Sequence, residues 1–185
     1  MPRTPTPPAD LLADWTLTEE TTETVFSLPT ATVEGHTRLY EDEGLRAQVV
    51  EAGGADRRWR FFFTTALEFQ PPLAPAVVPM VKPSVVTEAK RTFASDLRER
   101  GFENVETGRT ETVRVRSGAR ARLTAYRATL SSGETDLSIR GYLAVWHDDG
   151  FLLAGGAYPQ GGVSGAEIDP GEYRTELLDL IRAVA

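Results

Sequence analysis

The sequence has no cysteine, only two histidines, and only two lysines among its 20 basic residues. The lack of cysteine excludes disulfide bonds, thiolate metal ligands and cysteine nucleophiles, and it is compatible with any redox compartment. No run approaches eighteen apolar residues, so we expect no membrane span. The N-terminus also lacks the apolar stretch of a signal peptide, and we therefore expect a cytoplasmic protein.

The overall composition is that of a globular protein. The chain has 185 residues, of which 41% are hydrophobic and 25% are charged. These values suit one domain with a buried core and exclude bulk disorder. We expect the proline-rich residues 1–14 to form a disordered lead-in, and residues 15–185 to form a single domain.

The choice and placement of the charged residues are less ordinary. Eighteen of the basic residues are arginine, the net charge is −7, and the isoelectric point is near 5.0. This usage resembles that of extreme halophiles, although a GC-rich mesophile would share the preference for arginine. Residues 71–130 carry a net charge of +5, whereas residues 1–70 and 131–185 each carry −6. A basic middle segment between acidic flanks favours charge pairing within the chain.

The first half of the chain predicts strands. Residues 32–40, 45–51 and 59–69 have strand composition and are separated by turn-forming residues. In the third segment, aromatic residues alternate onto one face, while Phe62 and Ala66 fall on the other. Both faces of the sheet should therefore be covered.

Proline is dense between residues 70 and 83. This density excludes a helix or an inner strand there. We expect an apolar loop folded over the sheet, the alternative being an exposed docking surface. Ser84 then caps a helix that runs to about Arg100 and stops at Gly101.

The second half predicts an antiparallel meander followed by a helix. Closely spaced strand patterns with short turns between them favour sequential antiparallel pairing. Asp169 is the expected cap of the final helix, with Pro170 at its first position. The whole order of elements predicts an α+β fold. The four strand patterns are residues 105–116, 119–130, 137–147 and 151–158.

Four segments carry a resemblance to known proteins: Phe26–Pro29, Leu97–Phe102, Leu137–His147 and Phe151–Pro159. Together they resemble an uncharacterised family of haloarchaeal proteins. The order of elements is similar to the PsbP-like α/β/α sandwich, in which helices flank a mainly antiparallel sheet. That resemblance implies accessory or binding roles, as in extrinsic photosystem II proteins and a nuclear Ran-binding factor. The alternative fold is a helix-grip α+β barrel with a ligand cavity.

Signatures of catalysis, of cofactors and of metal binding are lacking. A serine triad would have to use His36 or His147 as its base, and residues 147–150 could offer nitrogen and oxygen ligands to a metal ion. Residues 147–150 end in Asp-Gly, which is typical of a hairpin turn. Ser164 lacks the spacing of a nucleophile elbow, and the chain has no phosphate loop or dinucleotide fingerprint. We expect no catalytic residue, no metal and no cofactor.

Arginines cluster around one predicted hairpin. A three-residue turn at residues 117–119 would place Arg116 opposite Arg120. The next pair along the strands would be Arg114 and Arg122, and all four guanidinium groups would share one face. Opposed like charges are destabilising, so this face needs compensating negative charge.

Three sources of that negative charge remain open: carboxylates of the same chain, a protein partner, or an anionic ligand. Arg140, on the next strand, shares its parity with two aromatic residues and could extend the arginine face toward them. The acidic overall charge does not favour nucleic acid, and molar salt would screen such binding. The candidate carboxylates nearby in sequence are Glu103, Glu106, Glu111, Glu134 and Asp136.

These observations predict a non-enzymatic accessory or protein-interaction domain in a halophilic cytoplasm. A protein partner or a homo-oligomer is the expected assembly, with no membrane association. The alternative is a binder of a small anionic ligand, or an enzyme, that uses a cavity between sheet and helices. Polar groups on a core face would mark such a cavity, and the sequence offers Thr65 and Tyr126.

Overall fold

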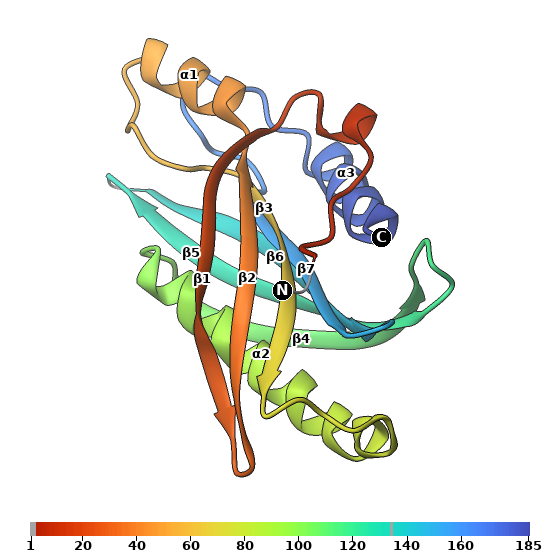
Figure 1. Ribbon diagram of the computed structural model, residues 1–185. Helices are drawn as coiled ribbons and strands as arrows, with labels where there is room; N and C mark the ends of the chain where they lie inside the picture. Colours follow the sequence, from red (N-terminus) through yellow and green to blue (C-terminus); the bar gives the residue numbers. More distant parts are fainter. Residues whose placement is uncertain (1–2, 134) are drawn as a thin grey trace.

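The protein is an α+β structure built on one seven-stranded antiparallel sheet (Figure 1). The computed structural model describes residues 3–133 and 135–185, and within them three α-helices accompany the sheet. The strand order is β1-β2-β3-β7-β6-β5-β4, so the chain builds two blocks of sequential hairpins that meet where β3 pairs with β7. The strands are β1 (Thr16–Leu28), β2 (Ala31–Glu41), β3 (Phe61–Gln70), β4 (Glu103–Arg114), β5 (Arg120–Ser132), β6 (Thr135–His147) and β7 (Phe151–Pro159).

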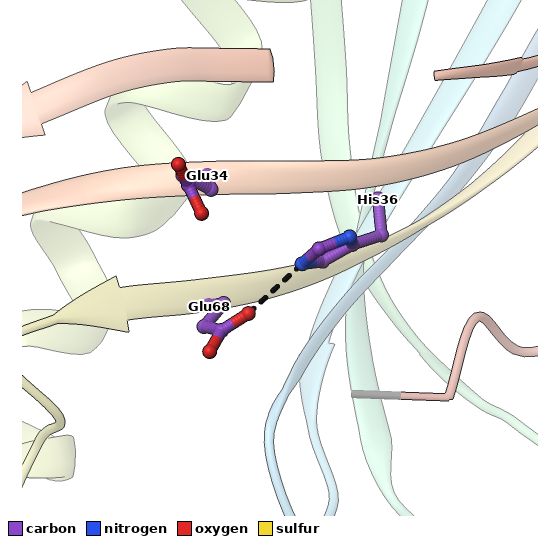
Figure 2. Close-up of side chains that lie close together, drawn as sticks. All are labelled: Glu34, His36 and Glu68. Carbon is purple, nitrogen blue, oxygen red and sulfur yellow. Dashed lines mark hydrogen bonds and ion pairs between the residues drawn. The ribbon is translucent and has the colours of Figure 1, made fainter. Parts of the chain in front are cut away.

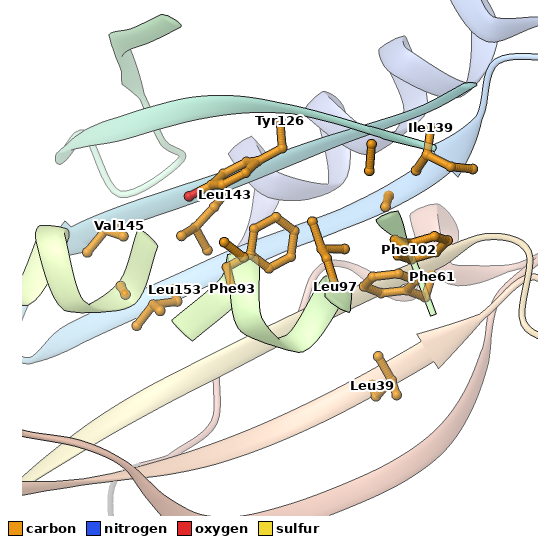
Figure 3. Packing of buried hydrophobic residues seen from close by; sticks show 14 of the residues in the cluster. Leu39, Phe61, Phe93, Leu97, Phe102, Tyr126, Ile139, Leu143, Val145 and Leu153 are labelled. Atoms are coloured by element: carbon orange, nitrogen blue, oxygen red, sulfur yellow. The ribbon is translucent and has the colours of Figure 1, made fainter. Parts of the chain in front are cut away.

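Two helices lie on opposite faces of this sheet. Helix α2 (Val78–Glu99) packs on what we call the inner face, and α3 (Pro170–Ala183) packs on the outer face. Figure 3 shows Phe93 and Leu97 of α2 among the inner-face residues Tyr126 and Leu143. The short α1 (Glu43–Glu51) lies at one end of the sheet. Each face therefore has its own apolar core.

Several expectations about the elements are confirmed. Strands β4 to β7 form the predicted antiparallel meander. In β3, Phe61 belongs to the inner core and Phe62 to the outer core, so both faces of this strand are covered. Helix α3 begins with Pro170, and the carboxylate of Asp169 accepts hydrogen bonds from the backbone N–H groups of Gly171 and Glu172. A local cap thus fixed where this helix starts.

The expectation of a strand over residues 45–51 was wrong, because this segment is the helix α1. The side chain of Asp42 caps it by accepting a hydrogen bond from the Leu45 N–H at 3.0 Å. Leu45 and Val49 are buried, and their spacing of four residues places them on one helical face. The same two apolar positions also fit a period of two, so the pattern alone does not distinguish a helix from a strand here.

The proline-rich segment also differs from expectation, since α2 begins at Val78 and not at Ser84. Pro79 lies in the first helical turn, whose backbone N–H groups have no partner within the helix. Pro83 is accommodated one turn later. Only residues 71–77 remain outside regular α-helix, and Met80 in the first turn is 78% exposed.

The N-terminal part contains two features that the sequence did not reveal. The thirteen-residue edge strand β1 is rich in threonine and glutamate and has no clear apolar alternation. The proline-rich segment that was expected to be a disordered lead-in is residues 1–14. Its first described residues lie against the outer face of the sheet. There, the Thr64 hydroxyl donates to the Pro5 carbonyl at 2.7 Å, and Arg38 donates to the Thr6 hydroxyl at 2.9 Å. Residues 1 and 2 lie outside the described residues.

The β4–β5 hairpin has a different register from the expected one. Arg114 pairs with Arg120, Arg122 pairs with Thr112, and Arg116 lies in the turn. The loop is residues 116–118, closed by the Val115 N–H donating to the Ala119 carbonyl. Gly118 has φ +91°, and a three-residue hairpin loop places its left-handed residue last. The position of this glycine therefore shifts the turn by one residue.

Candidate ligand-binding cavity

A cavity of about 360 Å³ lies between α2 and the first three strands of the sheet. Its walls come from the inner faces of β1, β2 and β3, from the second half of α2, and from two residues of β6 and β7. This volume lies within the range of pockets that hold small molecules. The cavity is therefore large enough to hold a small ligand.

The floor of the cavity is apolar and aromatic. The residues that form it are at least partly buried and include Leu39 on β2, Phe61 and Phe63 on β3, and Phe93 on α2. One polar pair interrupts this surface, because the hydroxyl groups of Thr37 and Thr65 lie 2.8 Å apart and share a hydrogen bond. Thr65, which the sequence suggested as a polar group on a core face, therefore does line a cavity.

Tyr126, the second suggested polar group, does not line the cavity. Its ring is buried beside Phe93, with the two ring centroids 4.8 Å apart, and its hydroxyl donates to the Lys90 carbonyl at 3.1 Å. Burial raises the pKa of this phenol well above its usual value. Tyr126 therefore holds α2 against the sheet.

The exposed part of the lining is polar and mostly acidic. Three exposed residues of β1, Glu19, Thr21 and Glu23, alternate onto the inner face and look toward α2. Helix α2 contributes the exposed carboxylates Asp96 and Glu99. A rim of four carboxylates thus surrounds an apolar floor.

One cation, Arg100, also lines this cavity. Its guanidinium carbon lies 4.8 Å from the centre of the Phe61 ring, and burial lowers its pKa. Arg58 lies close by and forms an ion pair with Glu19 at 3.0 Å. The carboxylates still outnumber the cation in the lining, so the electrostatic potential of the rim favours positive charge.

Asp96 is the lining group whose chemistry is most altered. Desolvation, together with the nearby carboxylates Glu99 and Glu23, raises its pKa from 3.8 to about 6, although Arg100 acts in the opposite direction. Its side chain lines the cavity and is exposed there, and the protein on its other side removes enough water to raise this pKa. Near neutral pH this carboxyl can therefore change charge in response to what enters the cavity.

Comparison with known proteins places the chain in a family. The model of a family described as "Domain of unknown function (DUF6517)" matches residues 4–185. The chain belongs to the DUF6517 family. The expectation of an uncharacterised family is thereby confirmed. Searches of curated proteins and of solved structures found no match.

The DUF6517 match extends over β1 to α3 and thus includes every residue of the cavity. Within residues 3–133 and 135–185, no helix combines the length and the apolar character needed to cross a membrane.

The arginines that the sequence singled out do not form one surface. Arg122 pairs with Val145, an inner-core residue, so Arg122 and its neighbours Arg114 and Arg120 lie on the inner face. Arg140 pairs with Tyr158 of the outer core and therefore lies on the opposite face. The expected extension of the arginine face toward Arg140 was wrong, since the strand parity separates the two.

The five arginines that the sequence singled out are Arg114, Arg116, Arg120, Arg122 and Arg140. None of them forms an ion pair with any residue that the structure describes. Arg122 instead donates to the Thr112 hydroxyl at 3.3 Å. Of the candidate carboxylates, Glu106 lies 3.6 Å from a different arginine, Arg127. Glu134 lies outside the described residues. The arginines at the hairpin remain exposed to solvent.

The two histidines have different surroundings. His147 packs against the Phe151 ring, and the turn after it is closed by the Asp148 N–H donating to the Gly150 carbonyl, so the expected hairpin turn is confirmed. His36 lies on β2 beside Glu34 and Glu68, whose carboxylates could join it around a metal ion. These three residues could not be grouped from the sequence, because Glu68 is 32 residues away from His36 along the chain.

Proposed function

We propose that this protein binds a small amphipathic ligand in the cavity between α2 and β1–β3. The ligand would place an apolar body on the aromatic floor and a positively charged group at the carboxylate rim. The observation that carries this proposal is the continuity of the two surfaces within one opening of about 360 Å³. Binding pockets commonly combine an apolar lining with a few polar groups that orient the ligand.

The charge of the rim argues against the anionic ligand considered from the sequence alone. An anion would meet Glu19, Glu23 and Asp96, and the one lining cation that could receive it is packed on Phe61. An ammonium group would instead replace the missing counter-charge. It would also lower the pKa of Asp96, because a nearby cation favours the ionised carboxylate.

The proposal can be tested by calorimetry with three probes of equal chain length: octylammonium, octanol and octanoate. We expect octylammonium to bind at least about fivefold tighter than octanoate, the difference that one or two partly exposed charge pairs produce. Octanol should fall between them. Equal or tighter binding of octanoate would overturn the cationic preference, and no binding of any probe would overturn the proposal.

Two variants of α2 locate the binding. Thr92→Trp places an indole in the cavity and should abolish binding of all probes. Thr87→Trp makes the same substitution on the exposed side of the same helix and should leave binding unchanged. Unaltered binding by Thr92→Trp would show that the probes bind elsewhere.

A second candidate function is the accessory or protein-interaction role. Its support is the exposed group Arg114, Arg120 and Arg122, which forms no ion pair within the described residues. Such a group suits an acidic protein surface, which a second copy of this net-negative chain could provide. Native mass measurement should detect a dimer that the double variant Arg114→Glu, Arg122→Glu loses. A wild-type chain that stays monomeric at every concentration would reject self-association.

We further propose a halophilic cytoplasm as the setting, and kinship with the PsbP-like sandwich. The first is supported by the excess of arginine over lysine and by the net charge of −7. The second is supported by helices on both faces of an antiparallel sheet. A stability that increases up to molar salt would fit the first proposal, whereas full stability without salt would count against it.

A further inference from the structure

We propose that Glu34, His36 and Glu68 bind a divalent transition-metal ion, with Zn²⁺ best matched to their donor atoms. This site lies on the outer face of the sheet, opposite the ligand cavity, and the proposal does not depend on the function of that cavity. One imidazole nitrogen and two carboxylates form a mixed ligand set that suits zinc. A fourth position would remain for water or for another ligand.

The pairing of β2 with β3 brings these donors together. Glu34 lies directly opposite Glu68, and His36 is two residues further along the same face of β2. One donor atom from each residue lies within 4.8 Å of the others (Figure 2). Because the donors stand on adjacent paired strands, their backbone is fixed before any ion arrives.

His36 is held in an orientation that suits a ligand. The residue is 6% exposed, and its Nδ1 lies 3.0 Å from the hydroxyl of Thr22 on β1. Its Nε2 points toward the carboxylates and lies 3.0 Å from an Oε of Glu68. A metal-binding histidine usually has a hydrogen-bond partner at its other ring nitrogen, and Thr22 occupies that place.

Glu34 is the residue that separates a metal site from a purely structural hydrogen bond. The His36–Glu68 pair alone would explain a buried imidazole, but Glu34 belongs to no ion pair or side-chain hydrogen bond within the described residues. Placing a second carboxylate beside that pair has an electrostatic cost unless a cation is shared. The metal accounts for all three residues.

The experiment is a titration of the intact chain with ZnCl₂, followed by calorimetry and thermal unfolding. At a free Zn²⁺ concentration roughly a hundred times the dissociation constant, we expect the melting temperature to rise by roughly 5–10 °C. Cobalt, which has visible absorption bands when bound by nitrogen and oxygen ligands, should compete for the same site. No heat of binding and no thermal shift with either ion would overturn the proposal.

Variants assign the ligands. Glu34→Gln removes a charge without breaking the His36–Glu68 hydrogen bond, so it should leave the fold intact and weaken Zn²⁺ binding at least about tenfold. His36→Gln should abolish binding, and His147→Gln, which removes the other imidazole, is the matched control and should bind normally. Wild-type affinity in Glu34→Gln, or loss of binding in His147→Gln, would contradict the assignment.

Thr22→Val tests the positioning role of the hydroxyl at Nδ1. We expect Zn²⁺ affinity to fall by about 10- to 100-fold, as is usual when a partner of a ligating histidine is removed. A shifted nuclear magnetic resonance signal of the His36 ring, with wild-type folding elsewhere, would show that the ring had lost its orientation. Unchanged affinity with an unchanged ring signal would exclude this role.

Discussion

Two helices cover opposite faces of the same sheet, yet the interface under α3 is tightly packed, whereas the interface under α2 is partly open. On the outer face, Leu180 and Ile181 of α3 and Trp146 of β6 are at most 2% exposed. On the inner face, α2 packs closely against Tyr126 of β5, but a cavity lined by β1, β2 and β3, and by Leu143 and Leu153, remains beside it. Apolar side chains would fill this space, and β1 offers Glu19, Thr21 and Glu23 instead. The side chains of one edge strand therefore decide whether this helix–sheet interface closes into a core or leaves a cavity.

The largest change in stability is expected from a pair of leucine-to-alanine substitutions, one on each face of the sheet. Leu180 on the outer face and Leu39 at the cavity are 2% and 3% exposed, so they are matched in burial. Leu180→Ala should lower the free energy of unfolding by about 2–5 kcal/mol, because it leaves an empty space in a closed core. Leu39→Ala should cost at least about 1 kcal/mol less, because water can enter the space that it adds to the cavity. Urea denaturation measures both, and equal losses would contradict the comparison.

A second test asks whether both faces of the sheet are closed at the glycines of β7. A Cβ on Gly155 would lie 2.6 Å from the Tyr142 carbonyl oxygen and 3.0 Å from the Phe63 ring, on the inner face. A Cβ on Gly156 would clash with the Phe61 carbonyl oxygen and would lie 3.0 Å from the Leu177 side chain, on the outer face.

Because β7 is crowded on both sides, Gly155→Ala and Gly156→Ala should each destabilise the protein by about 1–3 kcal/mol. Gly44→Ala, in α1 and without such a clash, is the control and should be neutral or slightly stabilising. A neutral Gly155→Ala, measured by thermal unfolding, would show that the inner face is not closed at this glycine.

A third test uses pH at the cavity itself. The pKa of Asp96 is about 6 in the folded protein, above its ordinary value of 3.8, so between these values the folded state binds more protons than the unfolded state. Wild-type stability should therefore decline as the pH rises through this window, and Asp96→Asn should remove that part of the decline. The variant should gain stability over wild type between pH 4 and pH 7.5.

Urea denaturation at the two pH values measures this gain. Asp10→Asn, remote from the cavity, controls for the loss of one negative charge. A stability difference between Asp96→Asn and wild type that is the same at both pH values would contradict a raised pKa.

The smallest effect is expected at the hairpin. Arg114 and Arg122 are exposed and form no ion pair with a described residue, so Arg114→Glu with Arg122→Glu should change the monomer's stability by no more than about 0.5 kcal/mol. A large loss of stability in denaturant unfolding would show that these arginines are paired within the chain after all.

Much of the fold could be read from local signals. Asp169 and Pro170 correctly predicted the start of α3. Gly101, with φ +92°, follows the end of α2 as expected. The alternation of aromatic residues in β3 correctly predicted a sheet that is covered on both faces. Where two periods fitted the same residues, as at Leu45 and Val49, the pattern could not distinguish a helix from a strand.

The sites could be read only in part. Thr65 could be predicted from the sequence as a polar residue on a core face. Glu19 and Glu23 could not be predicted, because β1 has no apolar alternation and the sequence does not show which strand it pairs with. Likewise Glu34, His36 and Glu68 meet only through the register of β2 with β3. The hairpin arginines could be located from the sequence, but their register could not. Gly118 is the last residue of the loop and not its middle one, and Arg116 therefore lies in the turn and outside the strand.

The sequence by itself determined the α+β class, the meander, the final helix and the two-sided sheet, because caps, turns and alternation act within a few residues. The tertiary structure decided which acidic and polar side chains meet at the cavity and around His36, and that Arg140 faces away from the hairpin arginines. Those outcomes depend on strand register and on the helix that covers each face, and both are settled by contacts between residues far apart in the chain.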